Sequence, residues 1–85
     1  MEIKVITKDN CSFCTRAKTL LSSRKLSFDE ILLDRDIDLD TVRSTYPSMR
    51  TFPIIVVNDE VVGGYDSLVE RIAENEYFGQ SIIKG

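Results

Sequence analysis

Cys11 and Cys14 are the two cysteines of the chain, and only Ser12 and Phe13 separate them. Such a pair could clamp a metal ion, brace the fold as a disulfide, or make and break a disulfide as its chemistry. A zinc site within one chain needs three or four protein ligands, and the sequence adds no histidine to the two thiols. A structural disulfide across so short a loop would remove little entropy from the unfolded chain. The spacing therefore favours a redox pair without a bound metal.

The position of Cys11 predicts which thiol reacts. Helical periodicity begins at Ser12, so Cys11 lies at the N-terminus of a predicted helix. The unpaired N–H groups and the dipole at a helix N-terminus favour a thiolate, and Cys-x-x-Cys thiols at such positions titrate with a pKa of roughly 3.5 to 7. We expect Cys11 to be the exposed nucleophile, with Lys8 and Arg16 nearby, and Cys14 to be the resolving partner, one turn further on and closer to the core.

The remaining pattern predicts the elements that must position this pair. Apolar alternation and apolar runs predict strands over residues 2–7, 28–33, 53–57 and 60–62, the last two joined by a hairpin turn at Asn58 and Asp59. Helical spacing predicts helices over 12–25 and 39–46, the second stopped by Pro47, and a third opened by a capping box of Ser67 and Glu70. The order β-α-β-α-β-β-α predicts an α/β fold with a mixed sheet covered by helices.

Length and charge limit the classes of function. With 85 residues, 42% of them apolar, we expect one domain over residues 1–85 and a monomer. No apolar run is long enough to span a membrane, and a net charge of −3 gives no general attraction to nucleic acid or anionic lipid. No secretory pattern opens the sequence, so two cysteines predict a reducing compartment, which we take to be the cytoplasm.

The charges are spread unevenly along the chain. Residues 11–27 hold four basic residues and no acid, whereas residues 28–40 hold six acids and Arg35. Two interpretations remain open. The two segments are either solvated faces of adjacent elements, or the basic segment supports a thiolate and attracts anionic ligands.

The segment TKDNCSFCTRAKTLLSS resembles the active-site segment of a glutaredoxin, and TFP at 51–53 and GGYD at 63–66 agree with that family in order and spacing. The likeness covers essentially the whole chain. It implies a thioredoxin fold, in which a four-stranded mixed sheet is flanked by three helices, and glutathione as the electron donor. It also implies a glutathione-disulfide oxidoreductase that reduces protein disulfides and glutathione mixed disulfides, with ribonucleotide reductase as a family-typical acceptor.

The resemblance also implies a glutathione groove. In such a groove Phe13 provides an aromatic wall, and a cis Phe52–Pro53 bond leaves the backbone of Phe52 free to pair with glutathione. Lys8, helped by Arg50, meets the glycine carboxylate, and Asp66 meets the γ-glutamyl end. The implied binding residues are Lys8, Phe13, Arg50, Thr51, Phe52, Pro53, Gly64, Tyr65 and Asp66, beside the catalytic Cys11 and Cys14. Without the resemblance, Pro53 could begin an edge strand, Gly63–Gly64 could be a plain turn, and Lys8 an ordinary surface lysine.

The sequence departs from the family between the cysteines, where dithiol glutaredoxins usually carry Pro-Tyr and this chain has Ser12-Phe13. Phe13 keeps the aromatic ring without its hydroxyl. Ser12 replaces a first-turn proline and offers an N–H and a hydroxyl that could pair with the Cys11 sulfur. Some glutaredoxins with serine here are thought to hold an iron–sulfur cluster between two subunits, which is one alternative function.

Two further alternatives concern the reductant and the activity itself. A glutaredoxin-like hydrogen donor would be reduced by thioredoxin reductase, and a complete glutathione groove counts against it. A non-enzymatic interaction module would have the fold alone, and the two thiols at the start of a helix count against that.

Overall fold

The elements follow one another in the predicted order in the computed structural model, which describes residues 2–74. The strands are β1 (Ile3–Thr7), β2 (Asp29–Leu32), β3 (Ile54–Val57) and β4 (Glu60–Gly63). The helices are α1 (Ser12–Ser23), α2 (Leu39–Thr45) and α3 (Tyr65–Glu74). None of these helices is long and apolar enough to cross a membrane.

The strands form one mixed sheet in the order β2-β1-β3-β4. Strand β1 runs parallel to β2, where Ile6 lies opposite Ile31, and antiparallel to β3, where Ile6 lies opposite Ile54. Strand β4 extends the sheet antiparallel to β3. The predicted α/β fold, a four-stranded mixed sheet flanked by three helices, is confirmed within the described residues.

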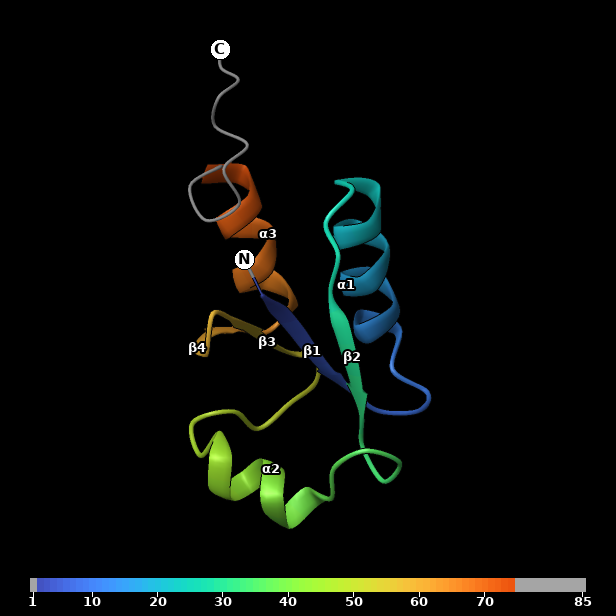
Figure 1. The fold of residues 1–85 in the computed structure, drawn as a ribbon, viewed down its shortest axis with the longest axis vertical. Helices are drawn as coiled ribbons and strands as arrows, with labels where there is room; N and C mark the ends of the chain where they lie inside the picture. The colour runs from blue at the N-terminus through green and yellow to red at the C-terminus, as the bar shows by residue number, and fades with distance from the viewer. Residues whose placement is uncertain (1, 75–85) are drawn as a thin grey trace.

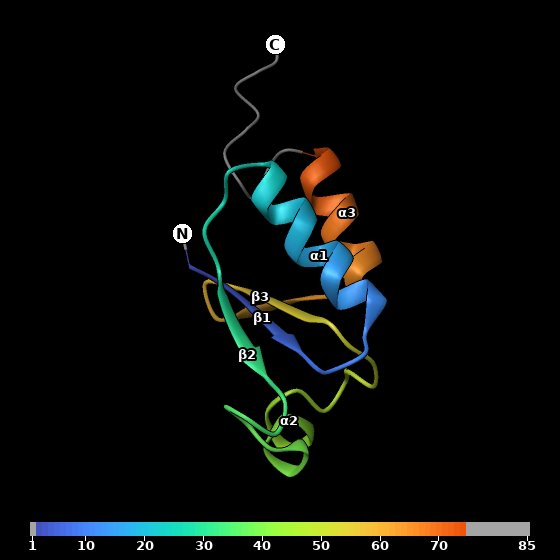
Figure 2. The same cartoon turned by 90° about the vertical axis from the view of Figure 1, so that its right-hand side faces the viewer.

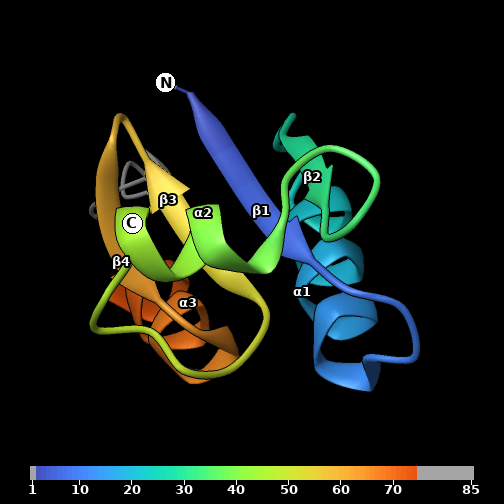
Figure 3. The same ribbon diagram turned by 90° about the horizontal axis from the view of Figure 1, so that it is seen from below.

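Helices cover both faces of the sheet. In Figures 1 and 2, α1 and α3 lie side by side on one face, and α2 lies across the other; Figure 3 views the sheet from the α2 side. Side chains of β3 alternate between the two layers: Ile55 and Val57 join the core beneath α1 and α3, and Ile54 and Val56 join the core beneath α2. Because both faces of β3 are buried, the residues just before it are held firmly in place.

Local backbone signals fix the element ends within a residue or two of the prediction. Helix α1 ends at Ser23, two residues before the predicted end, because Arg24 forms the C-cap and Lys25 takes a left-handed conformation with φ 61°. Helix α2 begins after Asp38, whose carboxylate accepts the Thr41 N–H at 2.9 Å. Asn58 and Asp59 have φ 50° and 68°, which fits the two-residue hairpin turn predicted for them.

The predicted start of α3 is wrong. The helix begins at Tyr65, and the Leu68 N–H donates to the Gly64 carbonyl at 3.1 Å, so Ser67 lies inside the first turn and does not cap it. The cause is Gly63, whose φ of +136° turns the chain from β4 almost directly into the helix. A Cβ at Gly63 would lie 2.5 Å from the Ser67 Oγ, so Ser67 packs closely on this glycine.

Candidate active site

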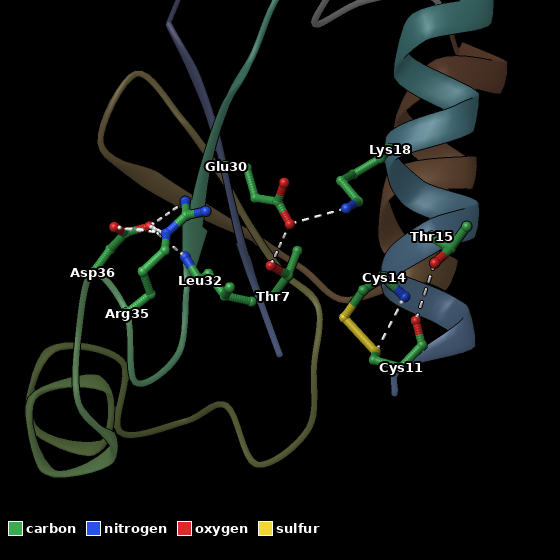
Figure 4. Close-up of polar contacts among 9 residues, drawn as sticks. All are labelled: Thr7, Cys11, Cys14, Thr15, Lys18, Glu30, Leu32, Arg35 and Asp36. Carbon is green, nitrogen blue, oxygen red and sulfur yellow. Dashed lines mark hydrogen bonds and ion pairs between the residues drawn. A yellow bond between two sulfur atoms is a disulfide. The ribbon is translucent and has the colours of Figure 1, made fainter. Parts of the chain in front are cut away.

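Cys11 and Cys14 form a disulfide at the N-terminus of α1 (Figure 4). Cys11 is the N-cap, and its Sγ accepts the Cys14 N–H at 3.1 Å. An N-cap side chain meets the amide of the second or third helical residue. The sulfur therefore contacts the Cys14 amide, and not the N–H or hydroxyl of Ser12 that the sequence suggested.

The two sulfurs differ in exposure, as their predicted roles require. Cys14 is 2% exposed and packs into the interior, whereas Cys11 is partly exposed. The Cα atoms lie 5.2 Å apart, which is within the usual range for two residues joined by a disulfide. An attacking sulfur must be reached from outside and a resolving sulfur only from its partner, so the geometry suits Cys11 as nucleophile and Cys14 as resolving thiol.

The TFP segment lies directly against the reactive sulfur. The Phe52 carbonyl oxygen is 3.8 Å from the Cys11 Sγ, and the Phe52–Pro53 peptide bond is cis, as predicted. Pro53 is buried and lies just before β3, which is a central strand. The structure thus excludes the reading of Pro53 as the start of an edge strand.

Two adjoining hollows flank this segment and share Phe13, Thr51 and Phe52. The α3-side hollow is also lined by Pro53, Gly64, Tyr65, Asp66 and Ser67. The α2-side hollow is also lined by Cys11, Lys8 and Arg50, and by residues of α2. The two hollows together, called the groove below, are lined by Cys11 and all nine residues predicted to bind glutathione.

Aromatic rings shape the groove. The Phe13 and Tyr65 rings lie 5.7 Å apart between centroids, and Phe13 remains 50% exposed, so a ligand can contact it. The Lys8 Nζ lies 5.7 Å from the centroid of the Phe52 ring. The Arg16 guanidinium lies 5.3 Å from the Phe13 ring centroid, and Arg16 lines neither hollow of the groove. The cations that line the groove therefore come from outside α1: they are Lys8, Arg43 and Arg50.

Some residues of the groove were not predicted from sequence. Leu33, Leu39 and Arg43 line the α2-side hollow together with Cys11. Leu39 and Arg43 are four residues apart and so share one face of a helix, but nothing in that spacing alone points to a thiol more than 25 residues away in the sequence. Ser67 lines the α3-side hollow because α3 starts early.

A third hollow, the β2-side hollow, is lined by both cysteines, Lys18 and Glu30, and shares Lys8 and Cys11 with the α2-side hollow. The Glu30 carboxylate accepts hydrogen bonds from Lys18 Nζ at 2.9 Å and from Thr7 Oγ1 at 2.7 Å (Figure 4). These two donors, Lys18 first, lower the pKa of Glu30 below its ordinary 4.5 because they stabilise the carboxylate. Part of the basic charge of α1 is thus neutralised by the acidic segment.

Among residues 2–74, no group of three or more Cys, Asp or Glu side chains is placed to hold a metal ion. The Cys11–Cys14 pair on a helix N-terminus, beside a groove, is an arrangement suited to thiol–disulfide exchange.

The glutaredoxin family model matches residues 3–62. The chain belongs to the glutaredoxin family. It is 33% identical over 66 residues to glutaredoxin 3 of Escherichia coli, covering 78% of this chain and 80% of that protein. It is 37% identical over 71 residues to hybrid peroxiredoxin hyPrx5 of Haemophilus influenzae, covering 84% of this chain but only 29% of that longer protein.

A solved structure agrees. The buckwheat glutaredoxin–glutathione complex is 25% identical and superposes with a TM-score of 0.79, covering 91% of this chain and 73% of that one. The fold of this glutaredoxin is therefore the thioredoxin fold, and the family supports thiol–disulfide oxidoreductase activity.

Proposed function

We propose that this glutaredoxin uses glutathione to reduce glutathione mixed disulfides and protein disulfides. The observation that carries the proposal is the groove, which opens beside the Cys11 sulfur with Lys8 and Arg50 in one hollow and Asp66 in the other. Glutathione carries a carboxylate at its glycine end, which complements Lys8 and Arg50, and an ammonium group beside a second carboxylate at its γ-glutamyl end, where the ammonium group complements Asp66. The similarity to a glutaredoxin solved with glutathione adds support.

In the monothiol route, the Cys11 thiolate attacks the glutathione sulfur of a mixed disulfide. A Cys11–glutathione disulfide forms, and the substrate leaves as a thiolate that takes a proton from solvent. A second glutathione thiolate then attacks the glutathione sulfur held on Cys11. This releases oxidised glutathione and restores the Cys11 thiolate.

In the dithiol route, Cys11 attacks one sulfur of a protein disulfide and becomes linked to the substrate, whose other sulfur leaves as a thiolate. The Cys14 thiolate attacks the Cys11 sulfur, expels the second substrate thiolate and closes the Cys11–Cys14 disulfide that this structure contains. Two glutathione molecules then reduce the pair and leave as oxidised glutathione.

Two classes of protein substrate follow from the family and its relatives. Ribonucleotide reductase is one proposed acceptor. A peroxiredoxin is the other, because a relative 37% identical to this chain bears the name hybrid peroxiredoxin. We place the activity in the cytoplasm, where glutathione keeps thiols reduced.

The test is a coupled assay in which NADPH consumption is followed with either glutathione and glutathione reductase or thioredoxin reductase. We expect turnover with glutathione. Cys11→Ser should abolish both routes, whereas Cys14→Ser should retain reduction of a glutathionylated substrate and lose reduction of a protein disulfide. Turnover by thioredoxin reductase alone would contradict the proposal, and loss of both routes in Cys14→Ser would contradict the assigned roles.

A further inference from the structure

The α2-side hollow holds an excess of positive charge. Lys8, Arg43 and Arg50 line it together with Cys11, and no acidic residue does, although the chain as a whole carries a net charge of −3. None of these three cations forms an ion pair with another residue of the described range. Their charge is therefore available to a ligand.

Glutathione alone does not account for this surface. Its glycine end offers one carboxylate, which the proposed function assigns to Lys8 and Arg50. Arg43 and Leu39 remain, one turn apart on α2 and facing the same hollow. Leu39 is 40% exposed, and Leu33 adds a second apolar side chain beside it. This part of the hollow pairs a free cation with an apolar surface.

Resting on the proposed function, we infer that Leu39 and Arg43 bind the polypeptide of the protein substrate and select target cysteines flanked by acidic and apolar residues. A carboxylate of the substrate would face Arg43, and an apolar side chain would cover Leu39. A glutathione disulfide without a polypeptide would leave this part of the hollow empty. The pair would therefore determine the choice of protein substrate and leave the exchange chemistry unchanged.

Three probes test the inference. The first is the mixed disulfide of glutathione with free cysteine, which has no polypeptide. The other two are glutathionylated peptides of equal length with a leucine beside the cysteine, one flanked by aspartates and the other by lysines. The quantity compared is kcat/KM, measured for the wild type, Arg43→Glu and Arg24→Glu. Arg24 is a matched control because it also lies at a helix C-terminus and changes by the same charge, but at the end of α1 far from Cys11.

We expect the wild type to prefer the acidic peptide by roughly tenfold, or about 1.4 kcal/mol, because the attraction of Arg43 for the aspartates and its repulsion of the lysines add, each being worth about 0 to 1 kcal/mol. Arg43→Glu should reverse this preference and leave the glutathione–cysteine disulfide unaffected, whereas Arg24→Glu should behave as the wild type. Leu39→Ser should weaken both peptides and spare the same small disulfide.

Other outcomes separate this inference from the function on which it rests. A wild type that reduces the glutathione–cysteine disulfide but is indifferent to peptide charge overturns the inference alone. Equal losses on all three probes in Arg43→Glu also overturn it, because Arg43 would then serve glutathione itself. A wild type inactive on every probe with glutathione overturns the proposed function.

Discussion

Two hollows meet at Cys11 and share Lys8, and they differ in whether their other charged side chains are paired within the fold. In the β2-side hollow, Lys18 is bonded to Glu30. In the α2-side hollow, Lys8, Arg43 and Arg50 have no acidic partner among the described residues. Charges that are satisfied within the fold contribute to its stability, whereas charges left without partners are available for binding. We therefore expect that removing the unpaired cations of the α2-side hollow weakens ligand binding, and that removing the Lys18–Glu30 pair lowers the stability of the fold.

The largest effect should come from the unpaired set. The double variant Lys8→Ala/Arg50→Ala should raise the KM for a glutathionylated substrate by roughly tenfold, because two exposed pairs of up to about 1 kcal/mol each are lost. The increase should be greater at low than at high ionic strength, and kcat and the unfolding midpoint should stay near the wild type. Steady-state kinetics over a salt series measures this. Arg24→Ala/Lys25→Ala removes the same charge at the far end of α1 and should leave KM unchanged.

Loss of the Lys18–Glu30 ion pair should have a smaller effect, on the free energy of unfolding and not on KM. Glu30→Gln removes the carboxylate that Lys18 and Thr7 contact, so the free energy of unfolding should fall by about 1 kcal/mol or less. The KM for glutathione substrates should not change. Urea unfolding compares this variant with Asp29→Asn, an exposed neighbour on β2. A Glu30→Gln protein of full stability but raised KM would reverse the distinction between the two hollows.

The smallest effect is the pH dependence of that stability difference. The pKa of Glu30 is lowered in the fold by Lys18 and Thr7, so its contribution is complete above the unfolded pKa of about 4.5 and is lost as pH falls through the lower, folded pKa. Urea unfolding of wild type and Glu30→Gln should therefore converge once the pH falls below the folded pKa of Glu30, which lies below 4.5. Asp36 and Asp38 also have lowered pKa values, but both proteins carry them, so the difference isolates Glu30. A difference that persists at acidic pH would contradict the ion pair.

Features carried by short motifs could be predicted from sequence. The two cysteines, the TFP segment and GGYD each combine residue types with fixed spacing, and the structure brings all of them to one groove. Arg43 and Leu39 could not be found in this way. They line the same hollow as Cys11 because α2 lies on the sheet face opposite α1 (Figure 2), and this placement depends on packing between distant segments.

Some predictions from short sequence patterns were wrong because a nearby backbone conformation overrode the pattern. Ser67 and Glu70 match a capping box, but Gly63 starts the helix two residues earlier. Ser12 seemed placed to contact the Cys11 sulfur, but the N-cap geometry of Cys11 brings the Cys14 amide there. Arg16, expected to support the Cys11 thiolate, contacts the Phe13 ring and lines neither hollow of the groove. At Ser67 and at Ser12, a backbone conformation determined the outcome: the positive φ of Gly63 sets where α3 begins, and the N-cap conformation of Cys11 sets which amide its sulfur contacts.

The glycine between β4 and α3 also limits how this family member can vary. A single nucleotide change converts a glycine codon to alanine, and at most surface turns the product would be tolerated. At Gly63 the added carbon would lie 2.5 Å from Ser67 Oγ and 2.8 Å from Ser67 Cβ, while the backbone stayed at φ +136°. The Oγ could rotate away but the Cβ could not, so the first turn of α3 would have to shift. That turn carries Tyr65 and Asp66, which line the α3-side hollow. A methyl group added at Gly63, which itself lines neither hollow, would therefore weaken ligand binding through the displacement of Tyr65 and Asp66.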